Sequence, residues 1–203
     1  MKYRKEDILR VTFYEFLHKG YESPIIPCLQ KQLGMSRGAV YRHYRDKNDL
    51  FKSVIDYYFF DRIKRILSVS DPRIKISQFI DMLYRKILLL LVLCEKAGVT
   101  QKTYLSYTGL LNQAIDFYPG FEEATRNIKE TFAIYFKRAF LNSIEAKEIK
   151  SGINIDLFSK LFTDIYLKDN KDYETGTGFF NNMKNGLTEK TRLLNYLFSL
   201  IKA

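Results

Sequence analysis

The sequence has few cysteines, and the two that are present lie far apart. Cys28 and Cys94 form no CxxC pair, so their spacing supports neither a disulfide framework nor a zinc site. A reducing compartment is the simplest interpretation, and we expect a cytoplasmic protein. Apolar runs are also short. The longest, residues 87–94, falls far below the roughly 20 residues that span a bilayer, and the charged start has no signal-peptide pattern.

Proline and glycine are scarce as well, with four and ten residues respectively, so long stretches of the chain are uninterrupted. These stretches repeat with a helical period. Leu9, Phe13, Phe16 and Leu17 form one apolar stripe that ends before Gly20. No stretch of convincing length shows the alternation of apolar and polar residues that is typical of β-strands. The sequence therefore predicts an all-α fold.

The helical period continues beyond residue 45. Its longest apolar part lies within residues 73–96, whose second half we expect to be buried on more than one side. The polar, glycine-bearing residues 169–178 are typical of a loop. The remaining helices are expected at residues 47–67, between Gly98 and Gly120 (one or two short ones), at 121–150, after a cap at Asn154 or Asp156, and at 187–201.

Charge of one sign is in excess. Lys and Arg number 33 against 23 Asp and Glu, which gives a net charge of +10. A basic balance suits a nucleic-acid partner, but basic globular proteins without such a role are common. Hydrophobic residues make up 46% of the chain and aromatic residues 15%, enough for a folded core.

Residues 25–50 follow a different pattern from the rest. Pro24 and Pro27 indicate a helix start, because proline is tolerated in a first turn and not deeper. Gly34 lies where that short helix must stop, a position that favours left-handed backbone. Ser36 is a good N-cap for a second helix. Two short helices joined by a tight glycine-bearing turn indicate a helix-turn-helix.

The second helix is expected to have two different faces. Val40 and Tyr44 are four residues apart and suit an interior. Arg37 and Tyr41 share another side, next to Gly38, where a bare backbone allows close approach. Arginine pairs in a bidentate way with phosphates and with guanine edges, so this face favours DNA binding over a merely solvated surface.

Lys47 follows at the start of the next helix. The free N–H groups of that helix start and the ammonium group together make a phosphate clamp. His43 is interpreted as a groove-edge or phosphate contact and not as a metal ligand, because the chain has only two histidines. The predicted DNA-binding residues are Ser36, Arg37, Gly38, Tyr41, Arg42, His43, Arg45 and Lys47.

This part of the chain resembles the tetracycline-repressor (TetR) family of bacterial transcription regulators. The resemblance runs from Ile8 through Gly20-Tyr21, then through LGMSRGAVYRHY at residues 33–44 and DKNDLF at 46–51. Tyr44 stands where phenylalanine is usual in the family. The resemblance implies a three-helix DNA-binding head, here residues 1–48, and a helical body, residues 49–203, that dimerises and binds a small effector. It also implies that Arg37, Tyr41, His43 and Lys47 touch DNA.

The expected function is therefore that of a homodimeric repressor released from a palindromic double-stranded DNA operator by a small hydrophobic or aromatic effector. We expect the helix at 121–150 to form the dimer together with one of the two that follow it. The alternatives are a protein-interaction module that keeps the motif without binding an operator, and an enzyme on a helical scaffold. Because the sequence holds no catalytic cluster, we predict no enzyme activity, metal or cofactor.

The aromatic residues of the body allow two interpretations. They can line an apolar ligand cavity with hydroxyl groups for orientation, or they can be ordinary core. The candidates for such a cavity are Phe79, Tyr84, Tyr104, Tyr107, Phe117 and Phe132.

Overall fold

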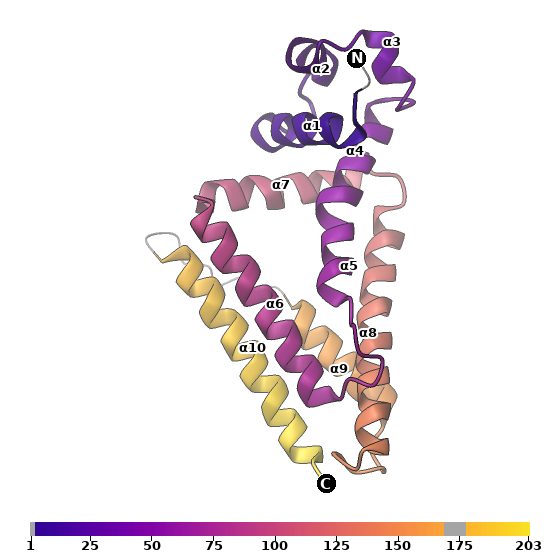
Figure 1. Cartoon of the computed structure of the whole chain (residues 1–203), viewed down its shortest axis with the longest axis vertical. Helices are drawn as coiled ribbons and strands as arrows, with labels where there is room; N and C mark the ends of the chain where they lie inside the picture. Colours follow the sequence, from indigo (N-terminus) through magenta and orange to yellow (C-terminus); the bar gives the residue numbers. More distant parts are fainter. Residues whose placement is uncertain (1–2, 169–177) are drawn as a thin grey trace. The chain divides into compact units, whose positions relative to one another are not determined.

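A computed structural model describes residues 3–168 and 178–203. Within these ranges the chain forms α-helices and one π-helical turn but no strand, which confirms the all-α prediction (Figure 1). The loop predicted at residues 169–178 lies outside the described ranges except for Gly178. The helices are α1 (Lys5–Lys19), α2 (Ile25–Leu33), α3 (Arg37–Tyr41), α4 (Lys47–Ile55), η1 (Asp56–Phe60, the π-helical turn), α5 (Asp61–Leu67), α6 (Ile76–Lys96), α7 (Gln101–Phe117), α8 (Phe121–Glu145), α9 (Ile155–Leu167) and α10 (Phe179–Ile201).

The chain divides into two compact units. The N-terminal unit holds Met1–Ile63 and Thr100–Thr125, and the C-terminal unit holds Lys64–Val99 and Arg126–Ala203. The N-terminal unit therefore contains the predicted head at residues 1–48 and, in addition, η1 and the whole of α7.

Aromatic and aliphatic side chains of α1 and α4 form the core of the N-terminal unit. Leu9 and Phe16 of α1 are almost fully buried, as the apolar stripe predicts. Phe16 meets Phe51 of α4 edge-on, with ring centres 5.4 Å apart. Helix α1 also packs against α2 and α7, so burial of its apolar stripe holds several elements together.

The helix predicted at residues 47–67 is interrupted by η1. A π-helical turn holds one more residue than an α-helical turn, so the face that points inward shifts along the sequence. Phe60 is buried as a result, whereas Tyr58 and Phe59, which the regular period places inside, are only half-buried. Tyr118 packs edge-on against Phe60, at 5.9 Å between ring centres.

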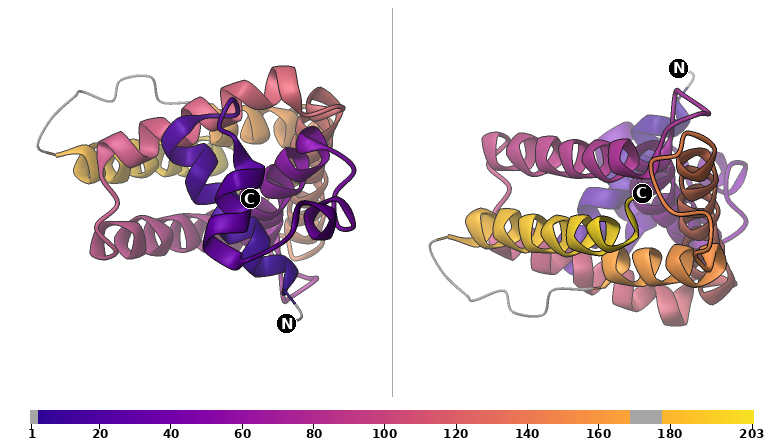
Figure 2. Two further views of the ribbon diagram at one scale, coloured as in Figure 1. Left: turned by 90° about the horizontal axis from the view of Figure 1, so that it is seen from above. Right: turned by 90° about the horizontal axis from the view of Figure 1, so that it is seen from below.

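In the C-terminal unit, α6 and α10 run side by side (Figure 2), and α8 and α9 share an aromatic core. Phe136 of α8 lies edge-on against Phe79 of α6, at 5.0 Å, and against Phe162 of α9, at 5.8 Å. The start of α6 is fixed by Ser143 of α8, whose Oγ accepts a hydrogen bond from the backbone N of Ile76 (2.8 Å).

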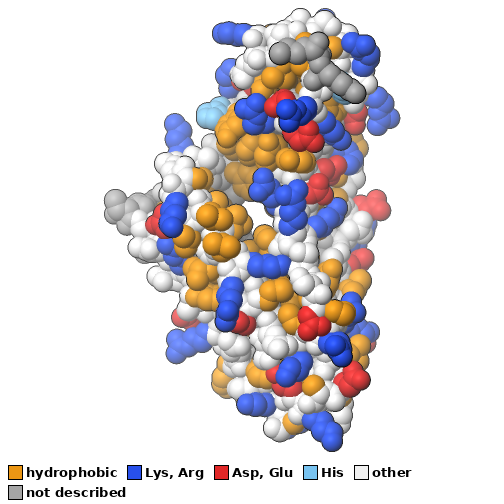
Figure 3. All heavy atoms as spheres, in the orientation of Figure 1, with side chains coloured by type: hydrophobic (Ala, Val, Ile, Leu, Met, Phe, Trp, Pro, Cys, Tyr) orange, Lys and Arg blue, Asp and Glu red, His pale blue; other side chains and the backbone are white. Residues whose placement is uncertain are grey.

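The expected burial of the apolar second half of α6 on more than one side is wrong for the single chain. Leu89, Leu90 and Leu93 are 58%, 40% and 54% exposed, whereas Leu91 is buried. Apolar side chains accordingly reach the surface over the upper part of α6 in Figure 3. The sequence shows which residues of α6 are apolar, but it does not show whether other parts of the chain cover them.

The predicted cap at Asn154 is confirmed, whereas the end of α8 and the start of α10 differ from the prediction. Asn154 is the N-cap of α9, since its Oδ1 accepts a hydrogen bond from Leu157 N (3.0 Å). Helix α8 ends at Glu145 and not near 150, because Lys147 turns the backbone into the left-handed region (φ 55°). Helix α10 begins at Phe179 and contains Gly186, which the prediction placed before the helix. Helix α7 is a single helix.

None of the helices in the described ranges has the length and apolar character needed to cross a bilayer.

Candidate nucleic-acid interface

The turn between α2 and α3 has the predicted construction. Gly34 adopts left-handed backbone (φ 67°) and ends α2, with its N–H donating to Gln30 O (2.9 Å). Met35 is 1% exposed and fills the corner. Ser36 caps α3, because its Oγ accepts a hydrogen bond from Ala39 N (3.2 Å). This local chemistry fixes the direction in which α3 leaves the turn.

The predicted inner and outer faces of α3 are also present. Val40 is 1% and Tyr44 4% exposed. Helix α3 is only five residues long, yet the backbone N of Tyr44 still donates to Val40 O (3.1 Å). The helical spacing therefore extends to Tyr44, which is buried together with Val40. On the other side Arg37 is exposed and Tyr41 is 44% exposed. The Arg37 guanidinium carbon lies 5.7 Å from the centre of the Tyr41 ring, so the two form one outward surface.

Gly38 has no evident role within the protein. A Cβ atom built on it meets no atom within 4 Å, and its φ lies outside the left-handed region. An alanine therefore fits the fold at this position. The bare backbone at Gly38 leaves room for a partner to approach the helix closely.

Arg42, His43 and Arg45 are exposed and follow α3 in the segment that leads to α4. Asp46 caps α4 through a hydrogen bond from Asp49 N to its Oδ1 (2.8 Å). The Arg45 Nε lies 3.9 Å from Asp49 Oδ2, and the Arg45 side chain is 88% exposed. Such a long, solvated ion pair is weak, so Arg45 can exchange it for a phosphate.

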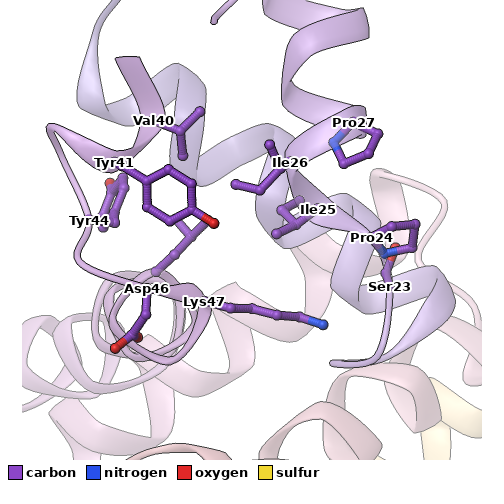
Figure 4. A pocket seen from close by; sticks show the side chains of 11 residues that line it. Ser23, Pro24, Ile25, Ile26, Pro27, Val40, Tyr41, Tyr44, Asp46 and Lys47 are labelled. Carbon is purple, nitrogen blue, oxygen red and sulfur yellow. The ribbon is translucent and has the colours of Figure 1, made fainter. Parts of the chain in front are cut away.

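A small recess lies between α2, α3 and the start of α4 (Figure 4). Its volume is about 170 Å³. Tyr41 and Lys47 line it together with mostly apolar residues: Ser23, Pro24, Ile25, Ile26, Pro27, Val40, Tyr44, Asp46 and Leu50. The sequence placed Pro24 and Pro27 at a helix start but did not show that they meet Tyr41 and Lys47 around one hollow.

Lys47 is held in place by a residue that the sequence analysis did not single out. Its Nζ lies 4.4 Å from the centre of the Tyr21 ring. The Tyr21 hydroxyl donates to Asn48 Oδ1, next to Lys47. Burial, with smaller contributions from Glu22 and Asp46, raises the pKa of Tyr21, so its hydroxyl stays protonated and neutral at ordinary pH. Gly20-Tyr21 is part of the resemblance to the TetR family, but no sequence pattern links it to Lys47.

The six aromatic residues considered for a ligand cavity are divided between the two units. Tyr104, Tyr107 and Phe117 lie in the N-terminal unit, and Phe79, Tyr84 and Phe132 lie in the C-terminal unit. The contacts of the first group include a hydrogen bond from the Tyr107 hydroxyl to Tyr58 O (3.2 Å). In the second group, Phe132 lies 5.3 Å from the ring of Tyr166. That these residues line a ligand cavity stays a prediction.

In the described part of the chain, no three side chains of His, Cys, Asp or Glu gather in a way that could hold a metal ion. Burial and the neighbouring Glu15 raise the pKa of the Cys28 thiol. A raised pKa keeps the thiol in its less reactive protonated form.

A capped turn that holds a short helix with a basic outer face defines a helix-turn-helix DNA-binding protein. Residues 8–54 match the sequence profile described as "Bacterial regulatory proteins, tetR family". The N-terminal part of the chain, which holds the helix-turn-helix, is therefore similar to this family of transcription regulators.

Among curated proteins, the chain is 29% identical over 92 residues to the uncharacterized HTH-type transcriptional regulator YuxN of Bacillus subtilis. That match covers 43% of this chain but only 32% of the length of YuxN. The fold is similar to that of reduced NemR from E. coli (TM-score 0.63, 13% identity, 98% and 97% of the two chains covered). It is also similar to FadR from Bacillus subtilis in complex with stearoyl-CoA (0.57, 16%, 96% and 97%).

Proposed function

We propose that this transcription regulator is a homodimeric repressor that binds a palindromic DNA operator and is released by a small-molecule effector. The observation that carries the proposal is the outward face of α3. Arg37 and Tyr41 are exposed side by side, and Gly38 between them leaves the backbone open where the fold itself does not need glycine. Such a face fits the major groove of duplex DNA.

The DNA-binding residues divide by their chemistry. Arg37 and Arg42 can pair in a bidentate way with guanine edges, so we assign base reading to them. Lys47, at the first turn of α4, binds a phosphate together with the free N–H groups of that turn. The remaining residues of the predicted set contact the sugar-phosphate backbone of the DNA or allow the DNA to approach closely: Ser36, Gly38, Tyr41, His43 and Arg45.

A dimer gives the binding site its symmetry. Two heads reach successive major grooves when they are about 34–36 Å apart, one turn of the duplex. Helices α8, α9 and α10 all carry exposed apolar residues that a partner copy would cover. These are Ile134 and Leu141 on α8, Leu157, Leu161 and Leu167 on α9, and Leu193, Tyr196 and Leu200 on α10. The pairing of α8 with α9 or α10 in a four-helix interface is supported by this exposure.

The effector site is proposed in the aromatic core of the C-terminal unit. The Tyr166 hydroxyl is buried there without a hydrogen-bond partner, beside Phe132 and Phe136. A buried, unsatisfied hydroxyl is costly, and a ligand with a polar group would satisfy it. An apolar or aromatic molecule with one hydrogen-bonding group suits these surroundings. The proposal is supported by FadR, a protein of similar fold whose structure is a complex with stearoyl-CoA. Release follows if the effector binds more tightly to an arrangement whose heads are out of register with the operator.

A mobility-shift titration on DNA from upstream of the protein's own gene tests the proposal. We expect a specific complex that resists an excess of unrelated duplex, that weakens as salt rises and that is weaker and less specific with Arg37→Ala. Candidate effectors added to the same reaction should dissociate the complex. Equal binding to the upstream and unrelated duplexes by both wild type and Arg37→Ala would contradict operator recognition.

A further inference from the structure

Tyr21, in the turn between α1 and α2, joins α4 to α7. Its ring stacks on Phe117 of α7, with ring centres 3.8 Å apart and an angle of 5° between the planes. Its backbone N donates to Oε1 of Gln113, also on α7 (2.7 Å). The Lys47 Nζ of α4 lies over the same ring at 4.4 Å. All four residues belong to the N-terminal unit.

This arrangement makes the Tyr21 ring a platform for Lys47. A free lysine side chain loses rotamer entropy when it is fixed. A cation over an aromatic ring is attracted by the ring quadrupole, so part of that ordering is already present before DNA binds. Phe51 packs edge-on against Tyr21 at 5.1 Å and 87°, so the platform is supported from α4 as well as from α7.

Helix α7 fits closely against the turn. Gln113 approaches Gly20 so nearly that a Cβ atom there would lie 3.1 Å from its Nε2, and Gly20 has left-handed backbone (φ 74°). The carboxamide of Gln113 therefore fits into space that a larger residue would occupy, and its Oε1 satisfies the neighbouring backbone N–H of Tyr21. The turn is thus held in place by a helix that begins almost eighty residues later in the chain.

We propose that Gln113 and Phe117 are positioning residues for DNA binding. Through Tyr21 they hold the Lys47 ammonium group where it meets a DNA phosphate. The inference rests on the proposed function, because it takes Lys47 as a phosphate contact. It adds that α7 belongs to the DNA-binding apparatus, so any displacement of α7 withdraws support from Lys47 and weakens binding.

The test uses full-length protein and a labelled mixed-sequence duplex of about 30 base pairs, with anisotropy read from about 50 to about 200 mM NaCl. Lys47→Ala should flatten the plot of log affinity against log salt by about 0.9 for each phosphate that the lysine neutralises in the wild type. Phe117→Leu, which removes the flat stack, should bind about two- to tenfold more weakly and shift the slope in the same direction. Phe117→Tyr keeps the stack and should bind like wild type. Ile115→Ala, at a position on α7 that is 63% exposed, is the matched control and should change nothing.

The double variant Lys47→Ala/Phe117→Leu decides whether Phe117 acts through Lys47. If it does, the double variant binds no more weakly than Lys47→Ala alone. Gln113→Met removes the acceptor for Tyr21 N at similar volume, and it should behave in the same way even if Phe117→Leu fails to fold. Losses that add both in Lys47→Ala/Phe117→Leu and in Lys47→Ala/Gln113→Met would overturn the positioning role and leave the proposed function intact. A wild-type protein that does not bind the duplex, or a Lys47→Ala variant with an unchanged slope, would overturn the phosphate contact and the positioning role with it.

Discussion

Replacement of Gly38 by alanine should stabilise the protein and weaken its binding to DNA. The added methyl group meets nothing within 4 Å in the free protein, and the backbone there is not left-handed. Alanine in place of glycine inside a helix contributes about 0.5–1 kcal/mol. Because Gly38 is the second residue of a five-residue helix, we expect the lower part of that range. For a protein of this size the melting temperature should rise by about 1–2 °C.

The same methyl group would stand between α3 and the DNA. Forcing one extra carbon into a closely packed interface costs about 1–3 kcal/mol, which corresponds to about 5- to 150-fold in affinity for each head. The assay is anisotropy with operator DNA, alongside a thermal melt of the free protein. Gly109→Ala is the matched control, since Gly109 lies in α7 with nothing within 4 Å of its built Cβ. It should also raise stability but leave DNA affinity unchanged. A Gly38→Ala variant that binds the operator as tightly as wild type would refute the close approach of DNA to this helix.

Three further predictions concern base reading, the buried tyrosine and the dimer. Arg37→Ala or Arg42→Ala, where the arginine reads a base, should cost about 1–3 kcal/mol at one operator position and relax the preference there; an equal loss on every sequence, measured by competition with single-base operator variants, would reduce it to a backbone contact. Burial, with smaller contributions from Asp49 and Glu6, raises the pKa of Tyr44 to about 12. Because the folded pKa lies above the unfolded value near 10, the contribution of Tyr44 to the free energy of unfolding should be constant below about pH 10 and should fall between about pH 10 and 12. Tyr44→Phe should lessen that fall and raise stability at pH 7 by about 1 kcal/mol, because the Tyr44 hydroxyl is buried without a partner; a lower melting temperature for Tyr44→Phe would contradict this account. Leu157→Asp on α9 should convert the dimer to a monomer in sedimentation at micromolar concentration, whereas Leu105→Asp on α7, an equally exposed position, should not; a wild-type monomer would remove the basis for both.

The parts of the site that depend on neighbouring residues were predictable from the sequence. Gly34 ends one helix and Ser36 begins the next through contacts within four residues. The pairing of Val40 with Tyr44, and of Arg37 with Tyr41, follows from the four-residue spacing of the helical period. Such features need no knowledge of the rest of the fold.

The parts that depend on distant residues were not predictable. Tyr21 and Phe117 lie almost a hundred positions apart, and no local pattern shows that their rings stack. The extra residue in η1 shifts the buried position to Phe60, which a regular period cannot anticipate. Leu89 and Leu93 read as core because they are apolar, but their exposure depends on what else the chain places beside them.

The attachment of α7 to the turn at Tyr21 limits how regulators of this kind can be recombined. A hybrid that takes only residues 1–48 from this chain would bring Tyr21 against a foreign helix, without the carboxamide and the ring that match it. The transplantable piece is discontinuous and consists of Met1–Ile63 together with Thr100–Thr125. A graft of both segments would carry its own support for Lys47 into the new host.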